Sequence, residues 1–396
     1  MISKKQVEFL SATLPRQTIV EGCISSGKTF ICNHKAIEHI VSNYKNQGLI
    51  FFVGRTLTTL ERNVLEPLAL QYKGDFKYSL NQKKATLCGI RIELEGCNDM
   101  TAEAKIRGST AEFIYGDELT LWNKPFLMRC MGSLRTPNAA FLGTTNPDSP
   151  LNFVNADYLE RKEELGLRNI KFDMLDNPSL TPEYIEQVSK EYVGVFHDRF
   201  IKGLWVLAEG LIYPNAEQAI VPTEPREYTE YQISCDYGIH NPTCFGLFGK
   251  CGDTWYMVKE YYHSGRDTNQ PKTDDEYYRE LERFAGDLPI RRIIIDPSAS
   301  SFITLIRRKG KFIVLPADNA VIDGIRNTAT ALSNGVVKIN DCCDRMKDEF
   351  KVYAWDEKSE EDRPIKESDH MCDLLRYFVH TNRLAVPKRK NRLADS

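Results

Sequence analysis

The sequence predicts an α/β protein of two domains, a parallel-sheet domain followed by a mixed-sheet domain. The chain has 396 residues, more than one hydrophobic core usually organises. Between residues 17 and 147, short apolar runs alternate with longer stretches of helical periodicity, which is typical of parallel strands joined by crossover helices. After Glu227 the apolar runs follow one another closely, as in antiparallel hairpins. We expect domains at 1–175 and 226–396, joined by a linker or hinge at 176–225.

Composition argues for an intracellular protein without a membrane partner. No run approaches the ~20 apolar residues that span a bilayer, and the first residues lack the apolar stretch of a secretory signal. The 11 cysteines are scattered, and the adjacent pair Cys342 and Cys343 lacks the second pair that a zinc site needs. The net charge of -3 does not exclude nucleic acid, because a basic stripe such as the tail at 387–392 suffices for phosphate contacts.

Elements are expected in this order. In the first domain the pattern predicts strands at 17–22, 48–54, 112–118 and 139–147, with helices at 28–44 and 56–72. The linker begins with turn signals at 176–182 and continues as a helix-like stretch at 183–205. In the second domain we expect strands at 231–238, 243–249, 254–262, 291–297 and 312–317. Helices are expected at 274–284, 321–332 and 370–382, and an exposed loop at 356–364.

A phosphate-binding loop is the first specific motif. Residues 22–29, GCISSGKT, fit Gly-x-x-x-x-Gly-Lys-Thr and lie between an expected strand and an expected helix. The backbone N–H groups of such a loop surround the β- and γ-phosphates of a nucleotide, with Lys28 neutralising charge and Thr29 offering its hydroxyl to Mg²⁺. The nucleotide-binding residues predicted here are Gly22, Ser25, Ser26, Gly27, Lys28 and Thr29.

Two further strand ends supply polar groups for hydrolysis. Asp117 and Glu118 close the strand FIYG, where Asp117 can serve the Mg²⁺ and Glu118 can polarise water. The alternative is a solvated acidic turn. Thr144, Thr145 and Asn146 end the strand AFLG and are placed to sense the γ-phosphate, although a simple strand exit explains them equally well.

An arginine is needed to stabilise charge in the transition state. Arg107 precedes the acidic strand and is followed by a glycine that permits an exposed turn. Arg55 and Arg62 are competing candidates for the same role.

A second set of carboxylates lies in the second half of the chain. Asp236 and Asp296 each close an apolar strand, and Asp369, His370 and Asp373 lie at the start of a helix. The spacing of Asp369 and Asp373 puts both on one helix face. Carboxylates from two strands and a helix can hold two Mg²⁺ or Mn²⁺ ions about 4 Å apart, which is the chemistry of phosphodiester cleavage. Each aspartate alone is also a common strand-end or helix-start residue.

In order and combination, these motifs resemble the large terminase subunit of tailed bacteriophages. The resemblance covers nearly the whole chain and rests on GCISSGKT, FIYGDE, GTTNP, DNPSLTPEYIEQV, GLWVLAEGLIYP, CDYG, IIIDP and KESDHMCDLLRY. It implies an amino-terminal P-loop ATPase of the additional-strand type and a carboxy-terminal nuclease with a ribonuclease H-like fold. It also implies that Glu118 is the catalytic glutamate and that Arg107 acts across a subunit boundary. GTTN is implied to be the coupling motif, which senses the γ-phosphate and transmits its loss to the rest of the protein. Gln6 is a weak candidate for adenine contact.

The activity implied is that of a viral DNA-packaging motor subunit, which uses ATP to move double-stranded DNA into a procapsid and cleaves concatemers with a two-metal site. The implied partners are double-stranded viral DNA, the portal protein and the small terminase subunit. A homo-oligomeric ring on the portal is expected, in the host cytoplasm and transiently at the procapsid, with a monomer in solution left open. A helicase-nuclease of DNA repair or defence, and a nucleotide-gated DNA-binding or scaffolding protein, remain as alternatives.

Overall fold

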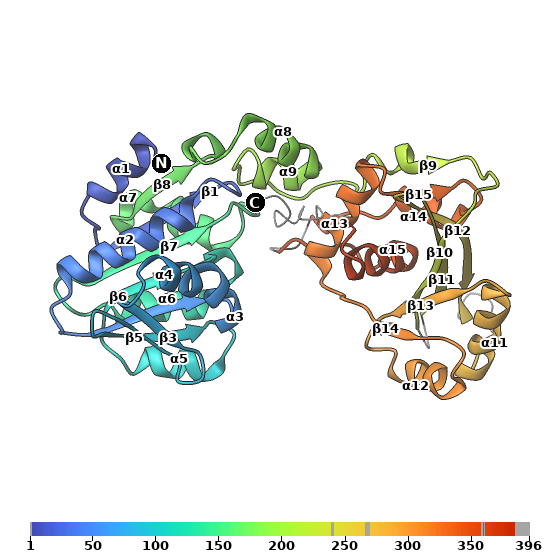
Figure 1. Cartoon of the computed structure of the whole chain (residues 1–396), viewed down its shortest axis with the longest axis horizontal. Coiled ribbons are helices and arrows are strands. Elements are labelled where there is room, and N and C mark those ends of the chain that lie inside the picture. Colours follow the sequence, from blue (N-terminus) through green and yellow to red (C-terminus); the bar gives the residue numbers. More distant parts are fainter. Residues whose placement is uncertain (1, 239–240, 266–269, 358, 360, 385–396) are drawn as a thin grey trace, which may run out of the picture. The chain divides into compact units, whose positions relative to one another are not determined.

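The chain divides into two compact units. The computed structural model describes residues 2–238, 241–265, 270–357, 359 and 361–384, so the basic tail at 387–392 lies outside the described residues. Unit 1 comprises Met1–Ser189 and Val195–Leu207, and unit 2 comprises Lys190–Gly194 and Ala208–Ser396 (Figure 1). The segment 176–225 is therefore shared between the two units. Every helix in the described part of the chain is too short or too polar to cross a lipid bilayer.

Unit 1 is built on one sheet whose central strands are parallel. In spatial order its strands are β3 (Phe76–Ser79), β4 (Lys84–Leu87), β5 (Ile90–Gly96), β2 (Leu49–Gly54), β6 (Ala111–Gly116), β7 (Ala140–Thr145), β1 (Gln17–Gly22) and β8 (Arg168–Phe172). Strands β5, β2, β6, β7, β1 and β8 pair in parallel. Strand β7 lies between the strand before the phosphate loop and the acidic strand β6, which confirms the predicted additional-strand fold.

Helices cover both faces of this sheet, which explains its continuous apolar strands. Along β2, Ile50 and Phe52 belong to one core cluster, and Phe51 and Val53 belong to the other. A strand buried on both faces has no polar alternation. The helices before residue 208 are α1 (Lys4–Ser11), α2 (Lys28–Asn43), α3 (Leu57–Leu60), α4 (Glu66–Gln71), α5 (Met100–Arg107), α6 (Lys124–Ser133), α7 (Lys162–Leu165), α8 (Pro182–Glu191) and α9 (Gly194–Phe200).

Three regions before residue 208 differ from the sequence prediction. Strands β3, β4 and β5 form antiparallel hairpins at the sheet edge that the pattern did not reveal. The short strands β3 and β4 carry exposed polar residues, Lys77 in β3 and Thr86 in β4. The predicted helix at 183–205 is broken, because α8 ends at Glu191 and α9 begins at Gly194, which has a φ of 57°.

The expected helix at 56–72 is interrupted by a π-helical turn. This turn, η1 (Glu61–Leu65), lies between α3 and α4. Pro67 has no backbone N–H, so it cannot donate to the carbonyl of Asn63 four residues earlier. That carbonyl instead accepts a hydrogen bond from Asn33 Nδ2 at 3.3 Å. π-helical turns often occur at functional sites.

Unit 2 has a mixed sheet with the strand order expected of a ribonuclease H-like fold. Its strands are β14 (Val314–Pro316), β13 (Ile290–Ile295), β10 (Glu230–Asp236), β11 (Thr243–Cys251), β12 (Thr254–His263), β15 (Val337–Asn340) and β9 (Ile220–Val221). Strands β10, β11 and β12 pair antiparallel, and β13 pairs parallel with β10. The described helices are α11 (Asp274–Ala285), α12 (Ser300–Lys309), α13 (Val321–Ser333), α14 (Asp344–Phe350) and α15 (His370–Thr381). The predicted fold class is confirmed.

Helix α15 lies directly against the sheet of unit 2 (Figure 1). A Cβ on Gly246 of β11 would lie 2.7 Å from Leu374 Cδ1, so the glycine lets α15 approach closely. The Ser234 hydroxyl of β10 donates to the Leu374 carbonyl at 2.7 Å. Phe248 and Phe378 stack with ring centroids 3.8 Å apart. These contacts fix the start of α15 beside the end of β10.

A buried carboxylate organises the link between α2 and β2. Glu112 of β6 accepts the backbone N–H groups of Lys45, Gln47 and Gly48, the last two at 2.8 and 3.2 Å. Glu112→Ala removes a buried carboxylate that accepts three backbone N–H groups, so we expect the free energy of unfolding of unit 1 to fall by about 2–3 kcal/mol. Urea denaturation measures this loss, with the exposed Glu163→Ala as control. A loss below about 0.5 kcal/mol would contradict the interpretation.

Candidate ATPase and nuclease sites

The phosphate loop connects β1 to α2, as predicted. Gly22 is the last residue of β1 and Lys28 is the first residue of α2. A Cβ on Gly22 would lie 2.1 Å from the carbonyl oxygen of Phe172 in β8, so only glycine fits here. The loop thus lies at the carboxyl edge of the parallel sheet, where open α/β sheets bind their ligands.

One hydroxyl of the loop is buried without a hydrogen-bond partner. The side chain of Ser26 is fully buried, and its Oγ contacts no donor or acceptor among the described residues. A buried unpaired hydroxyl is unfavourable unless a ligand satisfies it. Thr29, in the first turn of α2, is half-buried and lies one residue beyond Lys28. The loop therefore fits a phosphate ligand.

Lys28 is buried and held by two oxygen atoms. Its Nζ donates to Asn146 Oδ1 and to the carbonyl of Cys23, the latter at 3.2 Å. Burial lowers the pKa of Lys28, and the negative charges of Asp117 and Glu118 oppose that shift. Asn146 of the predicted coupling motif is thus in direct contact with the predicted phosphate-binding lysine.

Asp117 is fixed through both of its carboxylate oxygens. The Thr144 hydroxyl donates to Oδ1 at 2.6 Å, and Asn63 Nδ2 donates to Oδ2 at 2.9 Å. The Asn63 backbone is in turn contacted by Asn33 of α2, whose Oδ1 accepts from the Tyr115 hydroxyl at 2.7 Å. Sequence reasoning missed Asn63, because the π-helical turn that presents it has no sequence signature.

Glu118 adopts a left-handed backbone conformation with a φ of 57°. Such a conformation is strained for a residue with a Cβ and is often found at functional positions. Its N–H donates to Thr144 Oγ1 at 3.2 Å. Burial raises the pKa of the Glu118 carboxyl, nearby Asp117 raises it further, and the charges of Arg62, Lys28 and Arg55 oppose the rise. A carboxylate with a raised pKa is suited to take a proton from water.

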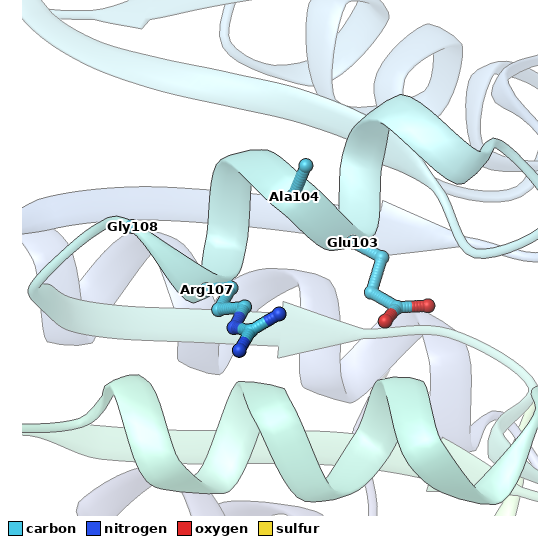
Figure 2. Close-up of a pocket in the computed structure, with 4 residues that line it drawn as sticks. All are labelled: Glu103, Ala104, Arg107 and Gly108. Carbon is cyan, nitrogen blue, oxygen red and sulfur yellow. The ribbon is translucent and has the colours of Figure 1, made fainter.

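The three candidate arginines occupy different places. Arg62 and Arg55 lie close enough to Glu118 to act on its pKa. Arg107 is the exposed last residue of α5, at the end of the helix that leads into the start of β6. Figure 2 shows Arg107 and Glu103 projecting from the same side of α5 in a shallow pocket that Ala104 and Gly108 also line. Because β6 starts at the opposite sheet edge, Arg107 lies away from the phosphate loop of its own chain.

Residues from beyond β8 also contact the phosphate loop. Asn177 Nδ2 donates to the Ser25 carbonyl at 2.7 Å, and the Tyr184 hydroxyl lies 3.1 Å from Ser25 Oγ. Gln6 is buried in α1, and its Oε1 accepts the N–H of Ser3 at 2.9 Å. A Cβ on Gly27 would lie 3.0 Å from Gln6 Nε2, so Gln6 lies beside the loop.

The acids of unit 2 converge from the elements that the sequence predicted. Asp236 ends β10 and Asp296 follows β13, and these parallel strands end at the same sheet edge. Asp369 is the N-cap residue of α15, with His370 and Asp373 in its first turn. The charges of Asp373 and Asp369 both act on Asp236.

Asp236 and His370 form a close pair, with His370 Nδ1 and Asp236 Oδ2 separated by 2.8 Å. Burial raises the pKa of Asp236, and the hydrogen bond from His370 offsets only part of that rise. Burial opposes the charged form of His370, but the bond to Asp236 and the surrounding acids outweigh it, so the His370 pKa is raised. Both shifts favour the retention of a proton by the pair.

Basic side chains compensate the helix acids. Arg376 Nη2 lies 2.9 Å from Asp373 Oδ1, and Lys366 Nζ lies 3.3 Å from Asp369 and 3.7 Å from Asp373. Among the described residues, no three His, Cys, Asp or Glu side chains are grouped tightly enough to hold a metal ion. The donor set itself, hard carboxylate oxygens with one imidazole, suits Mg²⁺ or Mn²⁺.

Asp296 is oriented by neutral hydrogen-bond donors. It accepts from the N–H of Ser298 at 2.7 Å and from Asn319 Nδ2 at 3.1 Å. Burial acts to raise its pKa, but these bonds and one from Tyr377 lower the pKa below the ordinary value. The charges of Asp236, Asp373 and Asp296 all act on the Tyr377 hydroxyl and raise its pKa, although burial is the larger cause.

A buried glutamate that sequence reasoning missed supports the start of α15. Glu349 Oε2 accepts the N–H groups of Met371 and Cys372 at 2.7 and 3.0 Å. Burial raises the pKa of Glu349 to about 7. A carboxylate at a helix amino terminus satisfies otherwise unpaired donors, so Glu349 fixes the helix turn that carries His370 and Asp373.

Comparison with known proteins identifies the family. The family model described as "Terminase large subunit, T4likevirus-type, N-terminal" matches residues 19–220, about half of the chain. Among curated proteins, none matches the chain. The large terminase of a thermophilic bacteriophage is 37% identical, superposes with a TM-score of 0.90, and the alignment covers 96% of this chain and 99% of that one.

The same thermophilic-phage terminase was also solved with nucleotides. Its complexes with ADP and with ATP-gamma-S each match this chain at 37% identity and a TM-score of 0.87, with the same coverage of 96% and 99%. The chain therefore belongs to the large terminase subunits of phages, the ATPases and nucleases of the motor that packages viral DNA.

Proposed function

We propose that unit 1 of this large terminase hydrolyses ATP at the phosphate loop and that unit 2 cleaves DNA at the acids of α15, β10 and β13. The observation that carries the proposal is the gathering of two chemically distinct sets of side chains. Lys28, Asp117 and Asn146 meet at the edge of one sheet. Asp236 and Asp373 meet at the edge of the other. The complexes of the thermophilic-phage terminase with ADP and ATP-gamma-S support ATP as the nucleotide.

Within unit 1, each polar residue has a distinct task. Gly22, Ser25, Ser26 and Gly27 shape the loop around the phosphates, and Lys28 exchanges its Asn146 contact for phosphate oxygens. Thr29 and Asp117 hold Mg²⁺, which neutralises charge on the phosphates. The buried Glu118 carboxylate accepts a proton from the attacking water.

The coupling motif at the end of β7 contacts the residues that are proposed to bind and hydrolyse the nucleotide. Thr144 bonds both Asp117 Oδ1 and the Glu118 N–H, and Asn146 bonds Lys28. Movement of Lys28 onto phosphate breaks its contact with Asn146. The end of β7 therefore responds to nucleotide, which is the local event needed to move DNA.

Within unit 2, Asp236, Asp296 and Asp373, with Asp369 and His370 beside them, are the residues proposed to hold Mg²⁺ or Mn²⁺. Paired divalent ions activate water and stabilise the leaving oxygen of a phosphodiester. Asn319, Ser298 and Arg376 orient the carboxylates.

The assembly proposed is a homo-oligomeric ring on the portal, in the cytoplasm of the infected host. Arg107 supports it, because this exposed residue lies away from its own phosphate loop and can reach a neighbouring subunit. Double-stranded viral DNA, the portal protein and the small terminase subunit are the proposed partners. The terminase matches give no support to a helicase-nuclease.

Mutations should separate the two activities. Lys28→Ala removes the phosphate-binding charge, so we expect ATP hydrolysis to fall roughly 100- to 1,000-fold while Mn²⁺-dependent plasmid cleavage stays unchanged. Asp236→Ala should do the reverse. Phosphate release and plasmid nicking assays measure the two rates on the same preparations. Loss of both activities from either change, in a folded protein, would contradict separate sites.

Mixing of two inactive variants tests the arginine. Arg107→Ala should lower ATP hydrolysis roughly 1,000-fold or more under conditions that assemble the ring. Mixed with Glu118→Ala, it should regain part of the activity, because an intact Glu118 then meets a neighbour's Arg107. Arg62→Ala mixed with Glu118→Ala is the control and should regain none. No recovery with Arg107→Ala would rule out its action between subunits.

Calorimetry tests the metal residues directly. We expect Mn²⁺ binding to unit 2 to weaken at least about tenfold in Asp296→Asn, because one carboxylate ligand is lost. The exposed Asp287→Asn serves as the matched control and should bind Mn²⁺ as the wild type does. Unchanged binding in Asp296→Asn would remove Asp296 from the proposed site.

A further inference from the structure

Ser25 holds an unfavourable backbone conformation inside the phosphate loop. Its φ is 55°, in the left-handed region that disfavours any residue with a Cβ. Phosphate-binding loops depend on their backbone shape, because their N–H groups are the ligands. Some contact must therefore stabilise Ser25 in this shape.

Two side chains from the segment after β8 make that contact. Asn177 Nδ2 donates to the Ser25 carbonyl oxygen at 2.7 Å, and the Tyr184 hydroxyl lies 3.1 Å from Ser25 Oγ, where either hydroxyl can donate. Asn177 also packs against Gly27, since a Cβ there would lie 3.4 Å from Asn177 Cγ. Asn177 thus holds the backbone of Ser25, and Tyr184 holds its side chain.

The segment that presents Asn177 is itself well anchored. Asn177 Oδ1 accepts the N–H of Ser179 at 3.1 Å, which fixes its amide with Nδ2 toward Ser25. The preceding turn is capped by Asp173, whose Oδ1 accepts from Leu175 and Asp176 at 2.9 and 3.2 Å. Asp176 pairs with Lys5 of α1 at 2.7 Å. The segment that supports the loop is therefore held by its own cap and by an ion pair to α1.

We propose that Asn177 and Tyr184 are positioning residues that hold the phosphate loop in its nucleotide-binding shape through Ser25. The inference rests on the proposed function of the loop as the ATP site. Neither residue contacts Lys28 or Glu118 in the described contacts, so the chemical step does not depend on them. They act on the affinity of the loop for the phosphates that ATP and ADP share.

These roles predict that loss of either side chain weakens nucleotide binding and leaves kcat nearly unchanged. In Asn177→Ala we expect the dissociation constant for a fluorescent ADP analogue and the KM for ATP to rise about five- to tenfold, with kcat within about twofold. Tyr184→Phe, which keeps the ring, should raise both by about two- to threefold. Two matched controls should change neither constant: Asn81→Ala at an exposed residue, and Tyr44→Phe at a half-buried tyrosine whose hydroxyl donates to Asn46.

Glycine at the strained position provides the decisive comparison. Ser25→Gly removes the steric penalty of the left-handed conformation. In that background the effect of Asn177→Ala on nucleotide affinity should shrink to about twofold, and Tyr184→Phe should have none, because its partner hydroxyl is absent. A double-mutant cycle on the dissociation constants measures both differences.

Each outcome decides a separate question. Unchanged affinity in Asn177→Ala and Tyr184→Phe, or a fall in kcat alone, would overturn the inference. An equal effect of Asn177→Ala with and without Ser25→Gly would also overturn it. If the wild-type protein failed to bind the ADP analogue, the proposed ATP site itself would fall. Thermal unfolding of each variant identifies any general loss of structure.

Discussion

The hydrogen bonds to the carboxylate of Asp117 are the constraint on which unit 1 depends. Thr144 of β7 donates a hydrogen bond to one carboxylate oxygen, and Asn63 of the π-helical turn donates to the other. Asn63 is tied through Asn33 to α2, the helix that begins at Lys28. One buried acid therefore links α2, β6 and β7, so a shift of any one of these elements alters the hydrogen bonds of the others.

Unit 2 also brings together polar side chains from separate elements, but it does so mainly through the packing of one helix on the sheet. Its acids come from two strand ends and one helix start, and α15 is brought to the sheet by Gly246 and held at its amino terminus by Glu349. Like charges repel unless cations compensate them, and here Lys366 and Arg376 do so. These acids thus lie beside basic side chains, and their carboxylate oxygens are of the kind that Mg²⁺ and Mn²⁺ prefer.

Much of this arrangement was predictable because parallel strands end at a common edge. The phosphate loop, Asp117 and Glu118, and the strand ends at Asp236 and Asp296 follow from local patterns that carry their own signals. Four further residues could not be predicted from local patterns, because their roles arise only when distant segments pack together. These residues are Asn63, Asn177, Tyr184 and Glu349. The hairpins of β3, β4 and β5 were not predicted, because β3 and β4 are only four residues long and the alternation of apolar and polar residues in β5 was not used as a signal.

The central claim is that one chain carries a nucleotide site and a separate metal site at the predicted side chains. A crystal structure with an ATP analogue and Mn²⁺, using anomalous scattering to locate the metal, tests it most directly. We expect triphosphate density along Gly22 to Thr29 and manganese peaks between Asp236, Asp296 and Asp373. Manganese bound elsewhere in unit 2, or a nucleotide away from Lys28, would contradict it.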